Sequence, residues 1–331
     1  MSASLAPILQ YFFSEHLVAH KQVSPCTIVA YRDSFRLLLQ FLQKRTGKKP
    51  SSLAVEDLDA PAILDFLESL EEQRANQVCS RNARLTAIRS FFHVVALRDP
   101  ASIGVVSRVL AIPRKRTDKR LVGYLTREEI DAVLAAPDQS TWIGRRDYAL
   151  LLTMYNSGAR LSEMTCLQRA QVKFDSAIYL QLHGKGRKER IVPLWAKTGR
   201  VLRSWFRELE GKATELAFPS VRGTSLSSDG LNYILQQAVK HAAGSSCPSL
   251  LTKRVTPHVI RHTCAMHLLQ AGVDMAVIAL WLGHESIETT HIYVEADLAI
   301  KQKALERIAP TNHPMRRFKA DDSLLTFLTS L

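Results

Sequence analysis

Residues 255–297 read VTPHVIRHTCAMHLLQAGVDMAVIALWLGHESIETTHIYVEAD, and this stretch places a few polar side chains at set points along short helices. His258 and Arg261 stand three residues apart, so a helix presents both on one face. His284 follows Arg261 after 23 residues, and Tyr293 comes nine residues later. A cation, two imidazoles and a phenol are therefore expected at the ends or inner faces of successive helices.

The limits of these helices are marked by their end residues. Thr256 and Pro257 are typical of a helix start, with the proline in the opening turn. Gly272 is a plausible end for the first helix, and Gly283 closes the next one. The second helix thus ends directly before His284.

These side chains suit an anionic centre. The fork of an arginine donates two parallel hydrogen bonds to a phosphate. A histidine passes a proton near neutral pH, and a tyrosine is a nucleophile once it is helped to lose a proton that it holds to a pKa of about 10. Taken singly, a histidine or tyrosine of this kind is more often a packing residue, and only the combination points to a reaction centre.

Composition narrows the class of protein. The chain of 331 residues has room for two domains, and its 46% apolar and 23% charged content predicts well-packed cores. Lys plus Arg exceeds Asp plus Glu by 44 − 31 = 13, which favours a polyanion as partner, nucleic acid first. An anionic membrane surface is the rival, but no basic amphipathic helix stands out to support it.

The setting of the protein is predicted from what the sequence lacks. No apolar run approaches the roughly 20 residues of a membrane span, and the N-terminus has no basic leader or small-residue cleavage site. The cysteines are odd in number and far apart, which indicates reduced thiols and neither a disulfide framework nor a zinc site. They are Cys26, Cys79, Cys166, Cys247 and Cys264. A cytoplasmic protein without membrane partners is expected.

The N-terminal part, residues 1–110, has helical periodicity throughout. Helices are predicted from residue 24 to 47, from 59 to 70 and from 76 to 97, where apolar residues recur at helical spacing. On the third helix Arg81, Arg84 and Arg89 alternate with apolar residues. These arginines form either a solvated face or a surface laid against a phosphate backbone.

A cationic linker follows at residues 111–123. It contains PRKRTDKRLVG, with Arg114, Lys115 and Arg116 in succession. A charge run of this kind is usually only solvated. Between two compact segments of a basic protein, it is better placed to cross DNA along its phosphates.

A second domain is predicted from residue 124. Thr126 and Glu129 have the spacing of a capping box, and a helix is expected over residues 144–157 with Gly158 as its stop. Arg160 then lies at a junction between helices, with Glu163 near enough to hold it. A structural ion pair and a phosphate contact are both open interpretations for Arg160.

The period changes to two over residues 178–194, which predicts a β-hairpin. Alternating apolar residues flank the turn GKGRK, which puts Lys185 and Lys188 at or near the tip. Lysines at such a tip are ordinarily solubilising. Two further helices are expected, from about 197 to 210 and from 231 to 242.

Five motifs in one order now carry a resemblance. They are GARLSE (158–163), HGKGRKER (183–190), TPHVIRHT (256–263), LGHES (282–286) and TTHIYVEAD (289–297). Together they resemble the tyrosine recombinase family, also called phage integrases. The resemblance covers residues 120–310 most specifically, and the last motif with the long tail looks like recombinases of mobile elements that transpose or integrate.

The resemblance implies a mostly α fold with a small β-hairpin or sheet in the catalytic domain. Residues 1–110 would be a helical core-binding domain on DNA, 111–123 a basic linker, 124–310 the catalytic domain and 311–331 a tail helix for docking between subunits. The two domains would close on DNA as a C-shaped clamp.

The resemblance also implies a role for each matching position. The six catalytic residues would be Arg160, Lys185, His258, Arg261, His284 and Tyr293, with Tyr293 as the nucleophile. Lys188 would touch a backbone phosphate, and the charge pattern described above favours the same contact for Arg81, Arg84, Arg114, Lys115 and Arg116. Glu163 would support Arg160, whereas His262, His267 and His291 would pack around the site.

The implied reaction is site-specific DNA recombination through a 3′-phosphotyrosyl bond, with no cofactor, metal or ATP. Double-stranded DNA would be the substrate, a homotetramer on synapsed sites the active assembly, and other recombinases or accessory proteins further partners in the nucleoid. Two other classes stay open: a type IB topoisomerase that relaxes DNA, and an accessory protein that binds DNA without cutting it.

Overall fold

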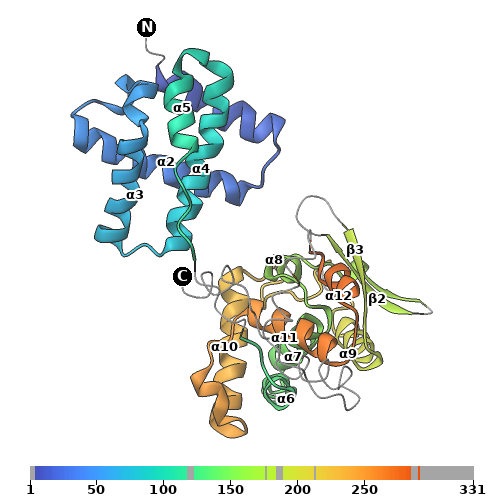
Figure 1. The fold of residues 1–331 in the computed structure, drawn as a ribbon. Coiled ribbons are helices and arrows are strands. Elements are labelled where there is room, and N and C mark those ends of the chain that lie inside the picture. The colour runs from blue at the N-terminus through green and yellow to red at the C-terminus, as the bar shows by residue number, and fades with distance from the viewer. Residues whose placement is uncertain are drawn as a thin grey trace, which may run out of the picture. The chain divides into compact units, whose positions relative to one another are not determined.

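The computed structural model describes residues 4–117, 123–175, 177–183, 189–211, 214–284 and residue 290. The chain forms two compact units, divided between residues 119 and 120 (Figure 1). Each unit has its own hydrophobic core. Within the described ranges, no helix is both long enough and apolar enough to cross a membrane.

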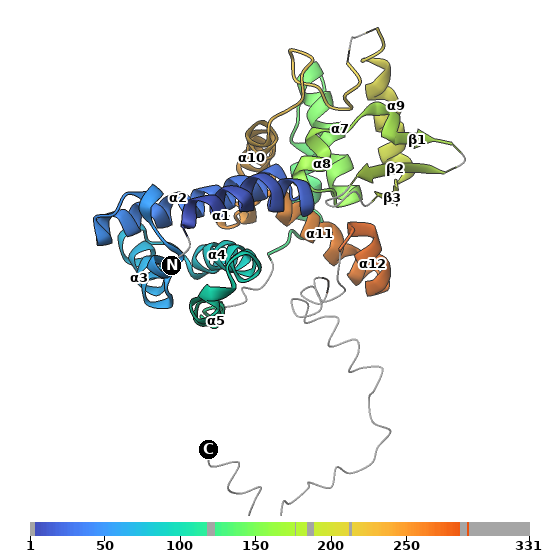
Figure 2. The ribbon, with the colours of Figure 1, turned by 90° about the horizontal axis from the view of Figure 1, so that it is seen from above.

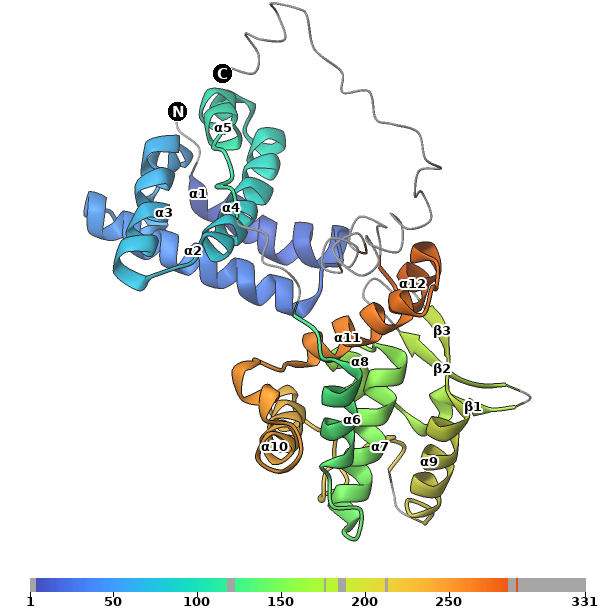
Figure 3. The ribbon, with the colours of Figure 1, turned by 60° about the horizontal axis from the view of Figure 1, so that its bottom comes forward.

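The first unit is built from helices alone in its described part, as Figure 3 shows in the blue to green ribbon. In chain order its elements are α1 (Leu5–Tyr11), the π-helical η1 (Phe12–His20), α2 (Pro25–Thr46), η2 (Pro50–Ser52), η3 (Val55–Leu58), α3 (Ala60–Arg74), α4 (Val78–Arg98), η4 (Pro100–Ser102) and α5 (Ile103–Leu110).

The three helices predicted for this unit are confirmed as α2, α3 and α4. Ser24 caps α2 by accepting from the backbone N–H of Thr27 at 3.3 Å, and Gly47 ends it in the left-handed conformation. Asp59 caps α3 in the same way as Ser24 caps α2. Residues 1–110 were expected to be helical throughout, but the bounds of η1 and α5 were not predicted, because neither has a long enough apolar repeat to stand out.

The core of the first unit is rich in aromatic rings. Phe12 of η1, Phe35 of α2 and Phe91 of α4 meet edge to face, with ring centroids 5.2 to 6.0 Å apart. Phe92 packs beside Phe91, and all four rings are at most 2% exposed. Offset and edge-to-face contacts of this kind stabilise a core beyond the area that they bury.

The second unit combines helices with one small sheet, as Figure 2 shows in green to orange. Its elements are α6 (Arg127–Ala135), α7 (Trp142–Ser157), α8 (Leu161–Thr165), η5 (Arg169–Gln171), β1 (Val172–Phe174), β2 (Ile178–His183), β3 (Glu189–Pro193), α9 (Ala196–Arg207), α10 (Ser228–Ser245), η7 (Pro248–Thr252), α11 (Pro257–Gln270) and α12 (Met275–Leu282).

The sheet confirms the predicted hairpin. Strands β2 and β3 pair antiparallel, with Leu180 opposite Val192 and His183 opposite Glu189, and β1 adds a third antiparallel strand. Leu180 and Leu182 are buried as the alternation predicted. Residues 184–188, the predicted tip with both lysines, lie outside the described residues.

Helix ends set the layout of the second unit. Thr126 and Glu129 form the predicted capping box at the start of α6. Helix α7 lies in the core and α11 packs against it. Helix α12 lies beside β3, as Figures 1 and 3 show. The predicted class, mostly α with a small sheet, is confirmed.

Candidate active site

The candidate site is organised around the C-terminal end of α12. Gly283 adopts the left-handed conformation, its N–H donates to Leu280 O at 3.1 Å, and the N–H of His284 donates to Ala279 O at 2.9 Å. This Schellman pattern satisfies two of the last carbonyl groups of the helix. The next three carbonyls, those of residues 281–283, point to other partners.

Three arginines from three different elements satisfy those three consecutive carbonyls. The pairs are Arg190 Nε to Trp281 O at 3.0 Å, Arg261 Nη2 to Leu282 O at 2.7 Å and Arg160 Nη2 to Gly283 O at 2.9 Å. A helix C-terminus carries partial negative charge, which favours cations at this place. The end of α12 therefore gathers three guanidinium groups.

Arg261 is placed by α11, which begins at Pro257 with Thr256 as its cap, as predicted. The Arg261 side chain is buried, and its Nη1 also donates to Gly158 O at 2.6 Å. Gly158 ends α7 in the left-handed conformation. One guanidinium thus ties the end of α7 to the end of α12, which holds its plane in a set direction.

Arg160 lies at the start of α8, two residues after Gly158. Glu163 accepts from the backbone N–H of Arg160 at 2.7 Å and from its Nη1 at 3.1 Å, which confirms the predicted contact between the two residues. The Arg160 side chain is 31% exposed, against 4% for Glu163. Arg160 can therefore still reach a ligand.

Arg190 on β3 is a site residue that the sequence did not suggest. Its fork donates to both oxygens of Glu163, at 2.8 and 2.7 Å, and its side chain is 9% exposed. In the sequence it stands at the end of the run GRKER and resembles its solvated neighbours. Only its place on a strand facing α12 distinguishes it from them.

The carboxyl group of Glu163 is ionised despite its burial. Burial acts to raise the pKa of Glu163, but the hydrogen bonds and charge of Arg190 and the backbone N–H and charge of Arg160 outweigh burial and hold it below its usual value. Three guanidinium groups against one carboxylate leave the cluster with an excess of positive charge.

Two histidines of the site, His284 and His262, have a lowered pKa and are neutral near pH 7. His284 is half-buried, and burial with the charges of Arg261 and Arg160 lowers its pKa to about 4. Its Nδ1 lies 2.9 Å from the hydroxyl of Thr290, which is buried. His258 is exposed on the first turn of α11, with its ring 6.5 Å from that of His262. Burial is the largest cause that lowers the pKa of His262 to about 4, and the charges of His258 and Arg261 lower it further.

The structure brings together four of the six predicted catalytic residues: Arg160 and Arg261 at the end of α12, His284 next to them in the chain, and His258 one helical turn before Arg261. Lys185 and Tyr293 lie outside the described residues, as do Lys188 and His291. His267 was expected to pack near the site. A hydrogen bond of 2.7 Å joins its Nδ1 to the hydroxyl of Tyr155.

The arginines of α4 that were predicted to contact phosphate differ in how far they are buried. Arg81 is buried, and its Nη1 donates to Asn82 Oδ1 at 3.2 Å and to Pro113 O at 3.4 Å. This geometry favours a structural role for Arg81 over a phosphate contact. Arg84 is half-buried, and its Nε has no hydrogen-bond partner in the described part of the chain. Arg89 donates to Leu110 O.

The linker begins attached to the first unit. Asn82 donates from Nδ2 to Lys115 O at 2.8 Å and accepts from Lys115 N at 3.1 Å, while Lys115 Nζ pairs with Glu71 at 2.6 Å. Arg114 and Arg116, on either side of this contact, are exposed. Their guanidinium groups are accessible to a phosphate backbone.

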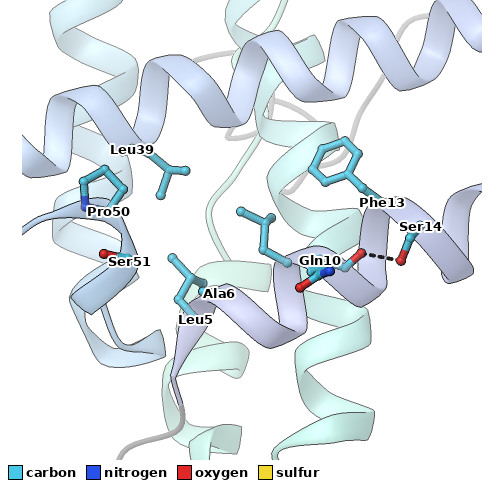
Figure 4. A pocket seen from close by; sticks show the side chains of 9 residues that line it. Leu5, Ala6, Gln10, Phe13, Ser14, Leu39, Pro50 and Ser51 are labelled. Carbon is cyan, nitrogen blue, oxygen red and sulfur yellow. Dashed lines mark hydrogen bonds between the residues drawn. The ribbon is translucent and has the colours of Figure 1, made fainter.

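Two pockets are lined by described residues that do not include Arg160, Arg190 or Arg261. In the first unit an apolar cavity of about 570 Å³ is lined by residues of α1, η1, α2 and η2, among them Leu5, Phe13 and Leu39 (Figure 4). A smaller pocket of about 440 Å³ in the second unit is lined by Arg127, His267 and their neighbours. No candidate catalytic residue lines either pocket.

The fold and the donor set define a class of protein. Arginines held in place beside neutral histidines stabilise the charge that develops on a phosphoryl group as it is transferred. Residues 123–299 match the Phage integrase family, and residues 11–98 match the Phage integrase, N-terminal SAM-like domain. The chain belongs to the phage integrase family.

Relatives of known sequence agree with this family. A Sinorhizobium fredii protein described as an integrase/recombinase is 52% identical over 329 residues, covering 99% of each chain. The tyrosine recombinase XerC of Chlamydia muridarum is 32% identical over 323 residues, covering 91% of this chain and 98% of its own.

Solved structures share the fold at low identity. The XerH recombinase bound to a palindromic difH substrate has a TM-score of 0.66 at 20% identity, over 86% of this chain and 80% of its own. The Tn1549 transposon integrase with transposon right-end DNA has a TM-score of 0.69 at 16% identity, over 94% and 100%. The protein is therefore a tyrosine-type site-specific recombinase, and the topoisomerase and accessory-protein interpretations are not favoured.

Proposed function

We propose that this recombinase cuts DNA by attack of Tyr293 on a phosphodiester, with Arg160, Arg261, His258, His284 and Lys185 as its catalytic partners. The observation that supports this most is the pair of hydrogen bonds from Arg160 and Arg261 to the consecutive carbonyls of Gly283 and Leu282. Two guanidinium groups held on neighbouring peptide groups are preorganised to grip one phosphate between them.

The charge balance of the step follows from these groups. The bond from the Tyr293 oxygen to phosphorus forms as the bond to the 5′-oxygen breaks, which leaves a 3′-phosphotyrosyl link. Arg160 and Arg261 bind the non-bridging oxygens, where negative charge builds up in the transition state. The arginines thus take the charge-neutralising role that a divalent ion has in other phosphoryl-transfer sites.

Proton transfer completes the step. His258, exposed on α11, accepts the proton of Tyr293, and Lys185 gives a proton to the departing 5′-oxygen. His284 stays neutral because its pKa is lowered to about 4, and it donates a hydrogen bond to the phosphate. A 5′-hydroxyl from a second duplex then attacks the phosphotyrosyl bond, so the bond energy is kept and ATP is not needed.

The substrate is double-stranded DNA, and the first unit and the linker supply some of the contacts to its phosphates. The exposed Arg114 and Arg116 support a contact along phosphates. Related structures include DNA complexes, among them a lambda integrase dimer bound to a COC′ core site. We extend this to a clamp of the two units on one duplex and to a homotetramer on two synapsed sites.

The tail beyond residue 320 would join the subunits of that tetramer. The spacing in its sequence SLLTFLTSL would put Leu324, Leu325, Phe327, Leu328 and Leu331 on one face of a helix, and such an apolar face would need a partner to bury it. Deleting residues 321–331 is expected to leave binding to a single site intact and to weaken assembly of paired sites in sedimentation. Unchanged assembly would rule out the docking role.

A covalent-trapping experiment tests the proposed chemistry. Supercoiled plasmid carrying the DNA that flanks this gene is incubated with wild type, with Tyr293→Phe and with Tyr233→Phe, a matched change at an exposed tyrosine of α10. Denaturant-resistant protein–DNA adducts are then mapped. We expect one defined site with a free 5′-hydroxyl in the wild type and in Tyr233→Phe, and no adduct in Tyr293→Phe.

Two other results would contradict the proposal. Adducts scattered without site preference would favour a relaxing enzyme. An adduct that survives in Tyr293→Phe would assign the nucleophile to another residue, and the role of Tyr293 would be withdrawn.

A further inference from the structure

Glu163 holds two arginines, but it holds them unequally. Arg190 contacts both carboxylate oxygens at 2.8 and 2.7 Å with its two terminal nitrogens, whereas Arg160 has one side-chain contact at 3.1 Å. A bidentate fork is the stronger of the two arrangements. The Glu163 carboxylate therefore pairs mainly with the guanidinium group of Arg190.

This division leaves Arg160 available. A buried carboxylate must be paired, because an unpaired charge away from water is costly. With Arg190 in place the Glu163 side chain, 4% exposed, is satisfied, and Arg160 keeps 31% of its side chain open. Without Arg190 the same carboxylate would draw Arg160 into a bidentate pair of its own.

Arg190 also links three parts of the site. It lies on β3, one residue after the start of the strand that leaves the hairpin tip, it holds Glu163 of α8, and its Nε donates to Trp281 O at the end of α12. Gly283 leaves room for this side chain, since a Cβ there would lie 3.0 Å from Arg190 Cδ. The position of the Arg190 side chain is thus fixed by Glu163 on α8 and by the end of α12.

We propose that Arg190 is a positioning residue of the recombinase, which neutralises Glu163 and steadies the end of α12 so that Arg160 remains free to bind the phosphate. The proposal rests on the proposed role of Arg160. Arg190 is assigned a positioning role and no direct contact with DNA, because its side chain is 9% exposed and its nitrogens donate to Glu163 and to Trp281 O.

A double-mutant cycle separates this role from a merely structural one. The variants are Arg190→Gln, Glu163→Gln and the pair together, with Arg190→Lys as the conservative change. Arg145→Gln is the matched control, because Arg145 makes an equivalent fork to Glu208, at 2.8 and 3.0 Å, between α7 and α9. Circular dichroism and the thermal midpoint report folding for each variant.

The first readout is the rate of adduct formation. Arg190→Gln is expected to lose about 100-fold, the size of effect that follows from misplacing a reacting group. Removing the carboxylate as well is expected to recover about tenfold, since the two changes are coupled. Arg190→Lys should fall between, because a lysine keeps the charge but not the fork. Arg145→Gln should cleave like wild type.

The second readout does not depend on DNA cleavage. Inorganic phosphate is added to the folded chain, and the rise in its thermal midpoint is followed with concentration. The rise is expected in the wild type, smaller in Arg190→Gln and restored in the double variant. Failure of the proposed function has a different signature, namely no adduct from the wild type while the phosphate response still differs between wild type and Arg190→Gln.

The proposal would be overturned by either of two results. One is that Arg190→Gln forms adducts and responds to phosphate like the wild type. The other is that the double variant stays as slow as Arg190→Gln, which would make Arg190 a packing residue of β3 and nothing more.

Discussion

Gly158 lies so close to Leu282 that a Cβ atom at residue 158 would come within 2.6 Å of Leu282 Cδ2. Gly158 is also in the left-handed conformation, with φ of 58°. The end of α7 and the end of α12 therefore approach each other at a place where only a glycine fits. The carbonyl of Gly158 accepts from Arg261 at this same contact, at 2.6 Å.

Gly158→Ala is expected to destabilise the second unit. A left-handed alanine costs about 1 kcal/mol, and the clash with Leu282 adds to it, for a total on the order of 2 to 3 kcal/mol. The midpoint of urea or thermal unfolding measures the loss. Gly244→Ala on α10 is the control, since a Cβ there meets nothing within 4 Å, and it should be neutral or slightly stabilising.

Stability is expected to depend on pH through His262. Its pKa is lowered to about 4 in the folded chain, so the unfolded chain binds more protons between pH 4 and about 6.5. Stability is therefore lost as the pH falls through this window and regained as the pH rises.

Replacing His262 by Gln removes this contribution. The free energy of unfolding, measured by denaturant titration at steps from pH 5 to 7, should fall less steeply with acid in His262→Gln than in the wild type. His241→Gln, at an exposed histidine of α10, is the control. Parallel curves for wild type and His262→Gln would contradict the assignment.

Substitution of Asn82 is expected to detach the start of the linker, around Lys115, from α4. Asn82→Ala removes both hydrogen bonds to the backbone of Lys115, each of which contributes about 1 kcal/mol. Trypsin is expected to cut after residues 114–116 about tenfold faster, because the local opening becomes easier. Mass spectrometry locates the cuts, and Thr86→Ala, one turn along α4 at an exposed position, should leave the rate unchanged.

DNA affinity is expected to distinguish exposed from buried arginines. Arg116→Gln should reduce the slope of log affinity against log salt by about 1 on a mixed-sequence duplex, since one phosphate contact is lost. Arg81→Lys should keep the slope and lower the thermal midpoint, because Arg81 is buried against Asn82 and Pro113. The opposite pattern would make Arg81 the phosphate contact.

The sequence predicted much of the local structure because helix ends have strong residue preferences. Ser24, Asp59 and Thr126 cap the helices that they were expected to start, and Gly158 and Gly283 end helices in the left-handed conformation. The contact of Glu163 with Arg160 was also predicted, because the two residues are only three positions apart in the sequence.

Long-range contacts were not predictable in the same way. Nothing in the spacing of Arg190 shows that it meets Glu163, 27 residues earlier, or Trp281, 91 residues later. Arg81 was expected either on a solvated face or against a phosphate backbone, but it is buried and donates to a backbone carbonyl of the linker, at Pro113. Such burial depends on tertiary packing, which a run of charges does not reveal.

The arginines at the end of α12 have one consequence for how substrates are chosen. Their spacing follows the covalent geometry of three successive peptide groups, those of Trp281, Leu282 and Gly283. In the proposed reaction, an arriving phosphate would meet Arg160 and Arg261 already in place, so little reorganisation would be needed on contact. A centre built in this way would treat every phosphodiester alike, and discrimination between DNA sequences would then have to come from surfaces that never touch the reacting phosphorus.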